Sequence, residues 1–202
     1  MIFSLIENLD KVDVILASTS PRRYELLKTI GLEFKIVASG ANESNDENLD
    51  PVSYALENAR KKACAVTEKH PNSLIISADT IVILDGIMMG KPVNEDDAYR
   101  MISALSGKTH KVCTAFGLAF KRYDKSFYDT VETEVTFREL TEEEIWEYIN
   151  TGEPFDKAGA YAIQGQGSIL VEKINGCFFN VVGFPLSKFF TDLDKFLAGL
   201  VL

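Results

Sequence analysis

The chain of 202 residues has no excess of basic residues, because 21 Lys and Arg stand against 30 Asp and Glu, a formal net charge of −9. A protein that grips a phosphate polymer needs clustered Lys and Arg in excess, so this balance argues against nucleic-acid binding. The chain also lacks an apolar stretch near the roughly 20 residues that cross a bilayer. We therefore expect neither nucleic acid nor a membrane among its partners.

Cysteine and histidine are scarce, and their spacing suits neither a disulfide framework nor a zinc site. Cys64, Cys113 and Cys177 are far apart and form no CxxC pair, so we expect buried thiols. His70 and His110 have no third partner at ligand spacing, and we expect surface or structural roles for both. The opening residues MIFSLIENLDKVD carry no basic region and no cleavage-site pattern, which predicts a reducing, cytoplasmic location.

Three further features are missing. No Gly-x-x-x-x-Gly-Lys-Ser/Thr loop occurs, so ordinary P-loop phosphoryl transfer is disfavoured. Internal repeats and long Pro/Gly/Ser linkers are also absent from the sequence. Because 46% of the residues are hydrophobic, the chain can bury a core of its own, and we predict a single domain over residues 1–202.

Short apolar runs rich in β-branched residues alternate with helical patterns along the chain. The expected strands are residues 12–17, 34–38, 74–84, 110–120, 127–137, 168–174 and 177–184, the last two as a hairpin joined at Asn175 and Gly176. The expected helices, from cap and periodicity signals, are residues 21–30, 51–69, 95–105, 142–151 and 186–197. This alternation predicts an α/β fold with a mixed sheet.

The segment ASTSPRRYELL joins an expected strand to an expected helix, with Ser20 as N-cap and Pro21 as the first helical residue. A helix N-terminus offers free N–H groups and a positive dipole end, and Ser18, Arg22 and Arg23 add further donors. Two positive charges in a first turn oppose the helix dipole, which favours a phosphate as the guest. The alternative is that Ser20 only caps the helix while the arginines are solvated.

Asp79 lies inside the apolar run LIISADTIVIL. A bare carboxylate there would cost several kcal/mol unless it is paired, bound to a metal or placed at an exposed strand end. A second interpretation stays open, in which Asp79 caps a local turn and Thr80 hydrogen-bonds nearby.

Two other segments offer chemistry when they are considered together with the first two. Lys91 stands between Gly90 and Pro92, where its ammonium suits phosphate oxygens. Gln164 stands in the glycine-rich DKAGAYAIQGQG, and its amide can match the paired N–H and C=O on an edge of uracil or thymine. Taken alone, each segment is more typical of an ordinary turn.

Together these segments resemble the Maf family of nucleoside triphosphate pyrophosphatases, over nearly the whole chain from Ile15 to Leu186. The matching motifs, in order, are LASTSPRRYELL, ADTIV, GKP, LSGKTHKVCTAF, GEPFDKAGAYAIQG and NVVGFPL. The resemblance implies an elongated, two-lobed α/β fold with a mixed twisted sheet and a central cleft, similar to the inosine triphosphate pyrophosphatases. It also implies an enzyme that hydrolyses nucleotides to the monophosphate and pyrophosphate with a divalent metal cation, Mg²⁺ or Mn²⁺.

The resemblance implies roles for individual residues as well. Asp79 corresponds to the catalytic carboxylate of the family, a proton acceptor, and Glu43 and Asp79 are the implied metal ligands. The implied substrate-binding residues are Ser18, Ser20, Arg22, Arg23, Lys62, Thr80, Lys91 and Gln164. Among these, Arg22, Thr80 and Gln164 correspond to positions that set substrate specificity.

The segment DKAGAYAIQG is similar to the subgroup that acts on dTTP and UTP, whereas the 7-methyl-GTP subgroup carries a glutamate-bearing segment there. Three positions depart from the family pattern: Asn42 replaces an acid that often precedes Glu43, and Ala162 and Phe184 replace a common Gly and Leu. A pyrophosphatase for 7-methyl-GTP or other modified nucleotides stays open, as does a non-catalytic nucleotide-binding regulator of cell division. A homodimer stays open too.

Overall fold

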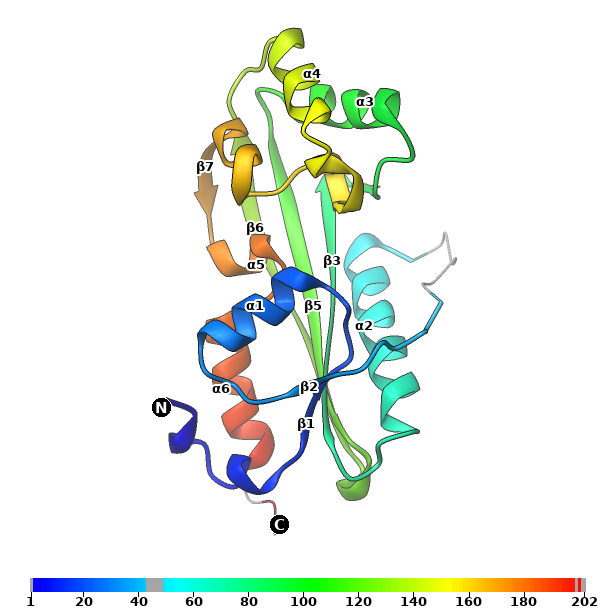
Figure 1. Ribbon diagram of the computed structural model, residues 1–202, viewed down its shortest axis with the longest axis vertical. Helices are drawn as coiled ribbons and strands as arrows, with labels where there is room; N and C mark the ends of the chain where they lie inside the picture. The colour runs from blue at the N-terminus through cyan, green and yellow to red at the C-terminus, as the bar shows by residue number, and fades with distance from the viewer. Residues whose placement is uncertain (1, 43–48, 199, 201–202) are drawn as a thin grey trace. The chain divides into compact units, whose positions relative to one another are not determined.

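The structure is a computed structural model that describes residues 2–42, 49–198 and 200 (Figure 1). Its strands are β1 (Val14–Leu16), β2 (Lys35–Ile36), β3 (Leu74–Leu84), β4 (Ile87–Met89), β5 (Thr109–Phe120), β6 (Lys125–Phe137) and β7 (Val171–Asn175). Its α-helices are α1 (Pro21–Thr29), α2 (Pro51–Thr67), α3 (Glu95–Leu105), α4 (Glu142–Asn150), α5 (Phe178–Val182) and α6 (Leu186–Leu197). Its 3₁₀ helices are η1 (Ile2–Leu5), η2 (Leu9–Lys11), η3 (Lys121–Tyr123), η4 (Glu153–Asp156), η5 (Ala158–Ala160) and η6 (Gly165–Leu170). Within these described residues, no helix combines the length and the apolar character that a membrane crossing requires.

One mixed sheet contains all the strands of the described residues, in the order β2-β1-β3-β5-β6-β7, with β4 paired to β3. β1 is parallel to β2 and β3, whereas β4 is antiparallel to β3 and β7 is antiparallel to β6. Parallel neighbours need crossover connections. In the sequence, α1 connects β1 to β2, and α2 connects β2 to β3. The predicted α/β class with a mixed sheet is confirmed.

Two helix starts show the local signals that the sequence carries. At α2, the carboxylate of Asp50 accepts hydrogen bonds from the N–H groups of Val52 at 3.1 Å and Ser53 at 3.2 Å. At α4, Thr141 and Glu144 form a complete capping box, each side chain bonded to the backbone N–H of the other residue. Since such caps satisfy donors that a helix start leaves unpaired, both boundaries could be predicted.

The predicted hairpin over residues 168–174 and 177–184 is wrong. β7 pairs with β6, and the chain that follows forms the helix α5. The aromatic and β-branched residues there imitate a strand, but Asn180 is fully buried among them. Its side-chain amide donates to the carbonyl of Val112 and to Oγ1 of Thr133, both at 3.0 Å. These tertiary hydrogen bonds override the local pattern, because a buried amide must find partners.

Contacts divide the chain into two compact units. The first unit comprises residues 1–79, 115–130 and 183–202, and the second comprises residues 80–114 and 131–182. Strands β3, β5 and β6 contribute residues to both units. The single domain over the whole chain stays a prediction.

Each unit has an apolar cluster of its own. In the first unit, α2 packs on β1 and β3 through a cluster of Ile15, Ala17, Ala63, Val66, Ile75 and Ala119. In the second unit, α3 and α4 pack with β3, β5 and β6 around buried side chains such as Leu105, Phe137 and Ile145. Full burial of a Leu, Ile or Phe side chain contributes about 1.5–3 kcal/mol, so this packing holds the strands that carry the site residues.

The predictions for cysteine and histidine are partly confirmed. Cys113 is buried, but Cys64 is exposed and Cys177 is only half-buried, so the expectation of buried thiols is wrong for Cys64. His110 is buried, and its Nε2 lies 2.7 Å from the hydroxyl of Tyr161. The structural role expected of His110 is therefore confirmed.

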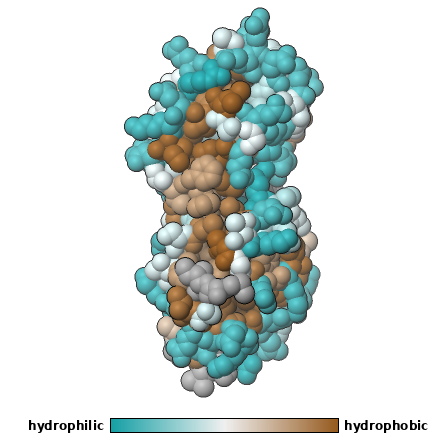
Figure 2. Space-filling model, turned by 60° about the vertical axis from the view of Figure 1, so that its left-hand side comes forward, coloured by the Kyte–Doolittle hydropathy of each residue, from teal (hydrophilic) through white to brown (hydrophobic). Residues whose placement is uncertain are grey.

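Both polar and apolar residues reach the surface on the face shown in Figure 2. In the second unit, the exposed large apolar side chains are Ile87, Met88, Val93, Phe155, Ile169, Phe178 and Phe179. The rings of Phe178 and Phe179 meet edge to face with their centroids 5.6 Å apart. The homodimer stays a prediction.

Candidate active site

The segment between β1 and α1 is the first part of the site. Pro21 begins α1 as predicted, but the side chain of Ser20 makes no capping hydrogen bond, so that part of the prediction is wrong. Instead, the buried hydroxyl of Ser18 accepts hydrogen bonds from the N–H of Ser20 and from Nη1 of Arg23, each at 3.2 Å. The hydrogen bonds of residues 18–23, the Ser18 turn, thus centre on the hydroxyl of Ser18. The sequence had indicated Ser20, two residues later, as the capping residue.

The two adjacent arginines differ in their surroundings. Arg23 is buried, and its Nε donates to the carbonyl of Gly183 at 3.0 Å, in the segment just before α6. Arg22 is half-buried in the first turn of α1. Arg23 therefore joins distant parts of the first unit, a structural role that the sequence did not indicate.

Asp79 is a buried carboxylate in the middle of β3. Its side chain is paired with the ammonium of Lys62, whose Nζ lies 2.5 Å from Oδ1, and Oδ2 accepts a hydrogen bond from Nδ2 of Asn58 at 3.2 Å. The expected compensation for burial is confirmed as pairing, and the alternative of a local turn is wrong. Asn58 was missed, although its place four residues before Lys62 puts both side chains on one face of α2.

The Ser18 turn and Asp79 lie at neighbouring strand positions within the first unit. In the parallel pair of β1 and β3, Leu16 is the register partner of Ile76, and the N–H of Ala17 donates to the carbonyl of Ile76 at 2.7 Å. Ser18 follows this pair on one strand and Asp79 on the other. The pairing of β1 with β3 therefore brings the chain that follows Leu16 alongside the strand that carries Asp79.

Thr80 is the first site residue of the second unit. Its Oγ1 lies 2.9 Å from Oγ1 of Thr114, whose hydroxyl donates to the carbonyl of Asn180 at 3.0 Å. Because a hydroxyl has one proton, Thr80 is the donor in its bond with Thr114. The orientation of Thr80 is therefore set by two buried residues that sequence reasoning did not single out.

Lys91 and Gln164 are both exposed, in two segments of the second unit that the structure connects. The carbonyl of Gly90 accepts a hydrogen bond from the N–H of Gly159 at 2.9 Å. Gly159 has φ 68°, a left-handed conformation that favours glycine. This bond joins the GKP segment to the glycine-rich segment, which the sequence alone does not reveal.

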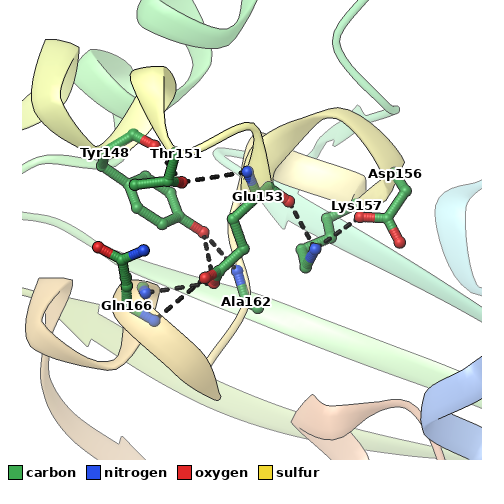
Figure 3. Close-up of polar contacts among 8 residues, drawn as sticks. Tyr148, Thr151, Glu153, Asp156, Lys157, Ala162 and Gln166 are labelled. Carbon is green, nitrogen blue, oxygen red and sulfur yellow. Dashed lines mark hydrogen bonds and ion pairs between the residues drawn. The ribbon is translucent and has the colours of Figure 1, made fainter.

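Glu153 was missed by sequence reasoning, yet it is central to the glycine-rich segment (Figure 3). Its carboxylate accepts hydrogen bonds from the hydroxyl of Tyr148 and from the N–H groups of Gln166 and Gly167. Its own N–H donates to Oγ1 of Thr151 at 3.1 Å. The signals in the sequence are its place just after the predicted helix and its place in the motif GEPFDKAGAYAIQG.

The predicted metal ligands are described only in part. Glu43 lies outside the residues that the structure describes. Within residues 2–42, 49–198 and 200, no group of three or more His, Cys, Asp or Glu side chains is placed to hold a metal ion. Asp79 is thus the one predicted ligand whose surroundings are known.

These observations define an α/β protein whose first unit holds a buried carboxylate paired with an ammonium group, and a hydroxyl bonded to a guanidinium group in the segment after the adjacent strand. Such groups suit a phosphorylated ligand. The chain belongs to the Maf family, whose description is "Maf-like protein" and whose match covers residues 13–196.

Relatives with curated names show the same kinship. A dTTP/UTP pyrophosphatase of Caldicellulosiruptor saccharolyticus is 49% identical, over 90% of this chain and 94% of the relative. A dTTP/UTP pyrophosphatase of Acetivibrio thermocellus is 48% identical, over 91% of this chain and 94% of the relative. A more distant likeness, with a TM-score of 0.42 and 14% identity, is to the structure of the Staphylococcus aureus Ham1 protein, over 61% of this chain and 72% of that chain.

Proposed function

We propose that this protein is a nucleoside triphosphate pyrophosphatase that hydrolyses dTTP and UTP to the nucleoside monophosphate and pyrophosphate. The names of its relatives, at up to 49% identity, support this substrate class. In the structure, the proposal is carried by one observation: the carboxylate of Asp79 is buried in β3 and paired with the ammonium of Lys62, and β3 lies parallel to β1, the strand that leads into the Ser18 turn.

The triphosphate would be bound by cationic and hydroxyl groups. In the first unit, the N-terminus of α1, Arg22 and the Ser18 turn offer donors to phosphate oxygens. Lys62, whose ammonium pairs with Asp79, would add a positive charge for the substrate. The other substrate-binding residues of the proposal are Ser20, Arg23, Thr80, Lys91 and Gln164.

Asp79 would accept the proton of the attacking water. Lys62 and Asn58 each use one lone pair of the carboxylate, so other lone pairs are left to receive a hydrogen bond from water. The water oxygen forms a bond to the α-phosphorus as the bond to the bridging oxygen breaks, and pyrophosphate leaves with the bonding electrons. Asp79 holds the proton released by the water, and nearby cationic groups stabilise the leaving group.

A divalent cation, Mg²⁺ or Mn²⁺, is part of the proposal. The carboxylate oxygens of Asp79 fit a hard cation, because lone pairs remain after the bonds to Lys62 and Asn58. Asp79 and Glu43 would hold it together with phosphate oxygens of the substrate. When bound, the cation neutralises phosphate charge and lowers the pKa of bound water.

The base would be read by Gln164, which is exposed at the start of η6. The edges of uracil and thymine present an N–H beside carbonyls, and cytosine presents a different pattern. An amide held in one orientation separates such patterns by about 1–3 kcal/mol. This reasoning favours dTTP and UTP over CTP.

The proposed setting is the cytoplasm, without a nucleic-acid partner. Cys64, Cys113 and Cys177 are free thiols, as expected in a reducing compartment. The net charge of −9 disfavours a phosphate polymer.

A panel of triphosphates tests the proposed function. Purified protein at substoichiometric concentration is incubated with dTTP, UTP, CTP, GTP and 7-methyl-GTP, with and without Mg²⁺ or Mn²⁺. We expect monophosphate and pyrophosphate in equal amounts, fastest from dTTP and UTP and only with a metal. Absence of turnover would favour the non-catalytic regulator, and a preference for 7-methyl-GTP would overturn the substrate assignment.

A further inference from the structure

The carboxylate of Glu153 and the segment Ala162–Gly167 form one hydrogen-bonded cluster within the second unit (Figure 3). Oε1 of Glu153 accepts hydrogen bonds from the hydroxyl of Tyr148 at 3.1 Å and from the N–H of Gly167 at 3.3 Å. Oε2 accepts a hydrogen bond from the N–H of Gln166 at 3.1 Å. The carboxylate therefore holds the chain on the C-terminal side of Gln164.

The N-terminal side of Gln164 is held by the same cluster. The hydroxyl of Tyr148 accepts a hydrogen bond from the N–H of Ala162 at 3.1 Å while it donates to Glu153. Tyr148 is buried, and burial raises the pKa of its hydroxyl, so it keeps the proton that it donates. Gln164 itself is exposed between two anchored flanks.

Two glycines allow the segment to approach this closely. Gly165 has φ 68°, and a Cβ there would lie 2.8 Å from Oε2 of Glu153. A Cβ at Gly167 would lie 2.3 Å from the carbonyl oxygen of Ala162 and 2.7 Å from the hydroxyl of Tyr148. The backbone thus packs directly on the two side chains, and a looser arrangement would not need glycine at these places.

The side of the cluster that bears Glu153 is also held in place. The N–H of Glu153 donates to Oγ1 of Thr151, and Nζ of Lys157 donates to the carbonyl of Glu153 at 2.5 Å. Lys157 also pairs with Asp156 at 2.5 Å. Lys157 contacts the backbone of Glu153. The hydrogen bonds described for the Glu153 carboxylate come from the hydroxyl of Tyr148 and from two backbone N–H groups, which are neutral donors (Figure 3).

We propose that Glu153 is a positioning residue that orients Gln164 and thereby sets the preference for uracil and thymine over cytosine. The inference rests on the proposed function, because it takes Gln164 as the residue that reads the base. Hydrogen bonds to an ionised acceptor are about twice as strong as neutral ones, so the carboxylate fixes the segment firmly. In Glu153→Gln only one of the two terminal side-chain atoms accepts hydrogen bonds, because the other is an NH2 group. That NH2 group would face the backbone N–H of Gln166 or of Gly167, and the hydrogen bond there would be lost.

A double-mutant cycle on nucleotide preference tests the proposal. The values of kcat and KM for UTP and CTP are measured for the wild type, Glu153→Gln, Gln164→Ala and the double variant. We expect Glu153→Gln to lower the UTP-to-CTP ratio of kcat/KM about 10-fold, and to lower it no further when Gln164 is already Ala. Amide hydrogen exchange of residues 162–168 should become faster in Glu153→Gln, a readout that does not depend on turnover.

Glu147→Gln is the matched control, since Glu147 is exposed on α4 next to Tyr148. This variant makes the same change from Glu to Gln. It should leave the UTP-to-CTP ratio of kcat/KM and the amide hydrogen exchange of residues 162–168 at wild-type values. If Glu153→Gln fails to fold, Tyr148→Phe removes only the hydroxyl of the cluster and should lower the ratio in the same direction.

The outcomes separate this inference from the function on which it rests. If the wild type releases no pyrophosphate, or Gln164→Ala keeps the ratio, the proposed function or the role of Gln164 fails, and the inference fails with it. If both hold but Glu153→Gln lowers kcat/KM equally for UTP and CTP, only the positioning role of Glu153 is overturned.

Discussion

Asp79 is a buried carboxylate whose charge is balanced by one ammonium. With Lys62 at 2.5 Å and Asn58 at 3.2 Å, it has two partners rather than the bare apolar surroundings that its strand suggests. A charge buried among hydrophobic residues survives only with such partners. The same pairing holds the carboxylate in one orientation, as a general base requires.

Asp79→Asn should lower turnover of dTTP about 10²-fold or more, with KM changed little, because the amide cannot accept the proton of water. Asp85→Asn provides the matched control, since Asp85 is exposed in the turn after β3. Steady-state kinetics on both variants measure the effect. Wild-type turnover by Asp79→Asn would show that another group accepts the proton.

His110 gives a pH dependence of stability. Burial between Phe137 and Tyr161 lowers the pKa of His110 to about 4 from the ordinary value of 6.5. Between these two values, the unfolded chain binds a proton that the folded protein does not bind. The contribution of His110 to the free energy of unfolding is therefore fully present above the pKa of the unfolded chain. It is lost as the pH falls toward the pKa of the folded protein.

Urea unfolding at several pH values measures this effect. We expect the free energy of unfolding to fall by about 2 kcal/mol through this group between about pH 7.5 and about pH 5. His110→Gln, which keeps a polar group near Tyr161, should lose that share of the pH dependence, whereas His70→Gln should keep it. An unchanged pH dependence in His110→Gln would mean that His110 is not the titrating group.

At the scale of elements, β5 and β6 meet closely at Gly117. A Cβ at Gly117 would lie 2.5 Å from two ring carbons of Tyr128 and 2.8 Å from Oγ of Ser77. The ring of Tyr128 thus occupies the space where other residues carry a side chain. The glycine is required here by packing rather than by its backbone conformation.

Gly117→Ala should lower the free energy of unfolding by about 1–3 kcal/mol, the usual effect of overpacking. Gly90→Ala is the control, because a Cβ at Gly90 meets nothing within 4 Å. Adding Tyr128→Leu to Gly117→Ala should recover part of the loss. Equal stability of the two alanine variants in urea would contradict this account of the packing.

Elements with local signals could be predicted from the sequence. Asp50 and Thr141 mark the helix starts that the structure has, since their caps depend on residues only two or three positions away. The α5 segment could not be predicted, because its conformation depends on hydrogen bonds from Asn180 to strand residues 47 and 68 positions away. Long-range partners override local propensity in such segments.

At the scale of the whole molecule, the mixed sheet could be predicted from the alternation of elements, but its order could not. The neighbours of β3 are β1, β4 and β5, so the strand that carries Asp79 runs next to the strand that leads into the Ser18 turn. The links from Gly90 to Gly159 and from Glu153 to Gln166 are also tertiary. Sequence reasoning thus found the chemical groups and missed the residues that orient them.

Metal removal should affect activity without affecting the fold. In the proposed site the cation is held by phosphate oxygens of the substrate together with Asp79 and Glu43, since hard cations prefer oxygen ligands. A chelator should therefore abolish turnover of UTP, while the Tm of the protein without nucleotide stays constant. A large fall in Tm on chelation would indicate a structural metal instead.

The most direct measurement of the central claim is the fate of the oxygen from water during hydrolysis of UTP. The reaction is run in water enriched in heavy oxygen, and both products are analysed by mass spectrometry. Attack on the α-phosphorus predicts UMP that carries the heavy oxygen together with unlabelled pyrophosphate, and Asp79→Asn should form both far more slowly. Labelled pyrophosphate, or release of UDP and inorganic phosphate, would contradict the account.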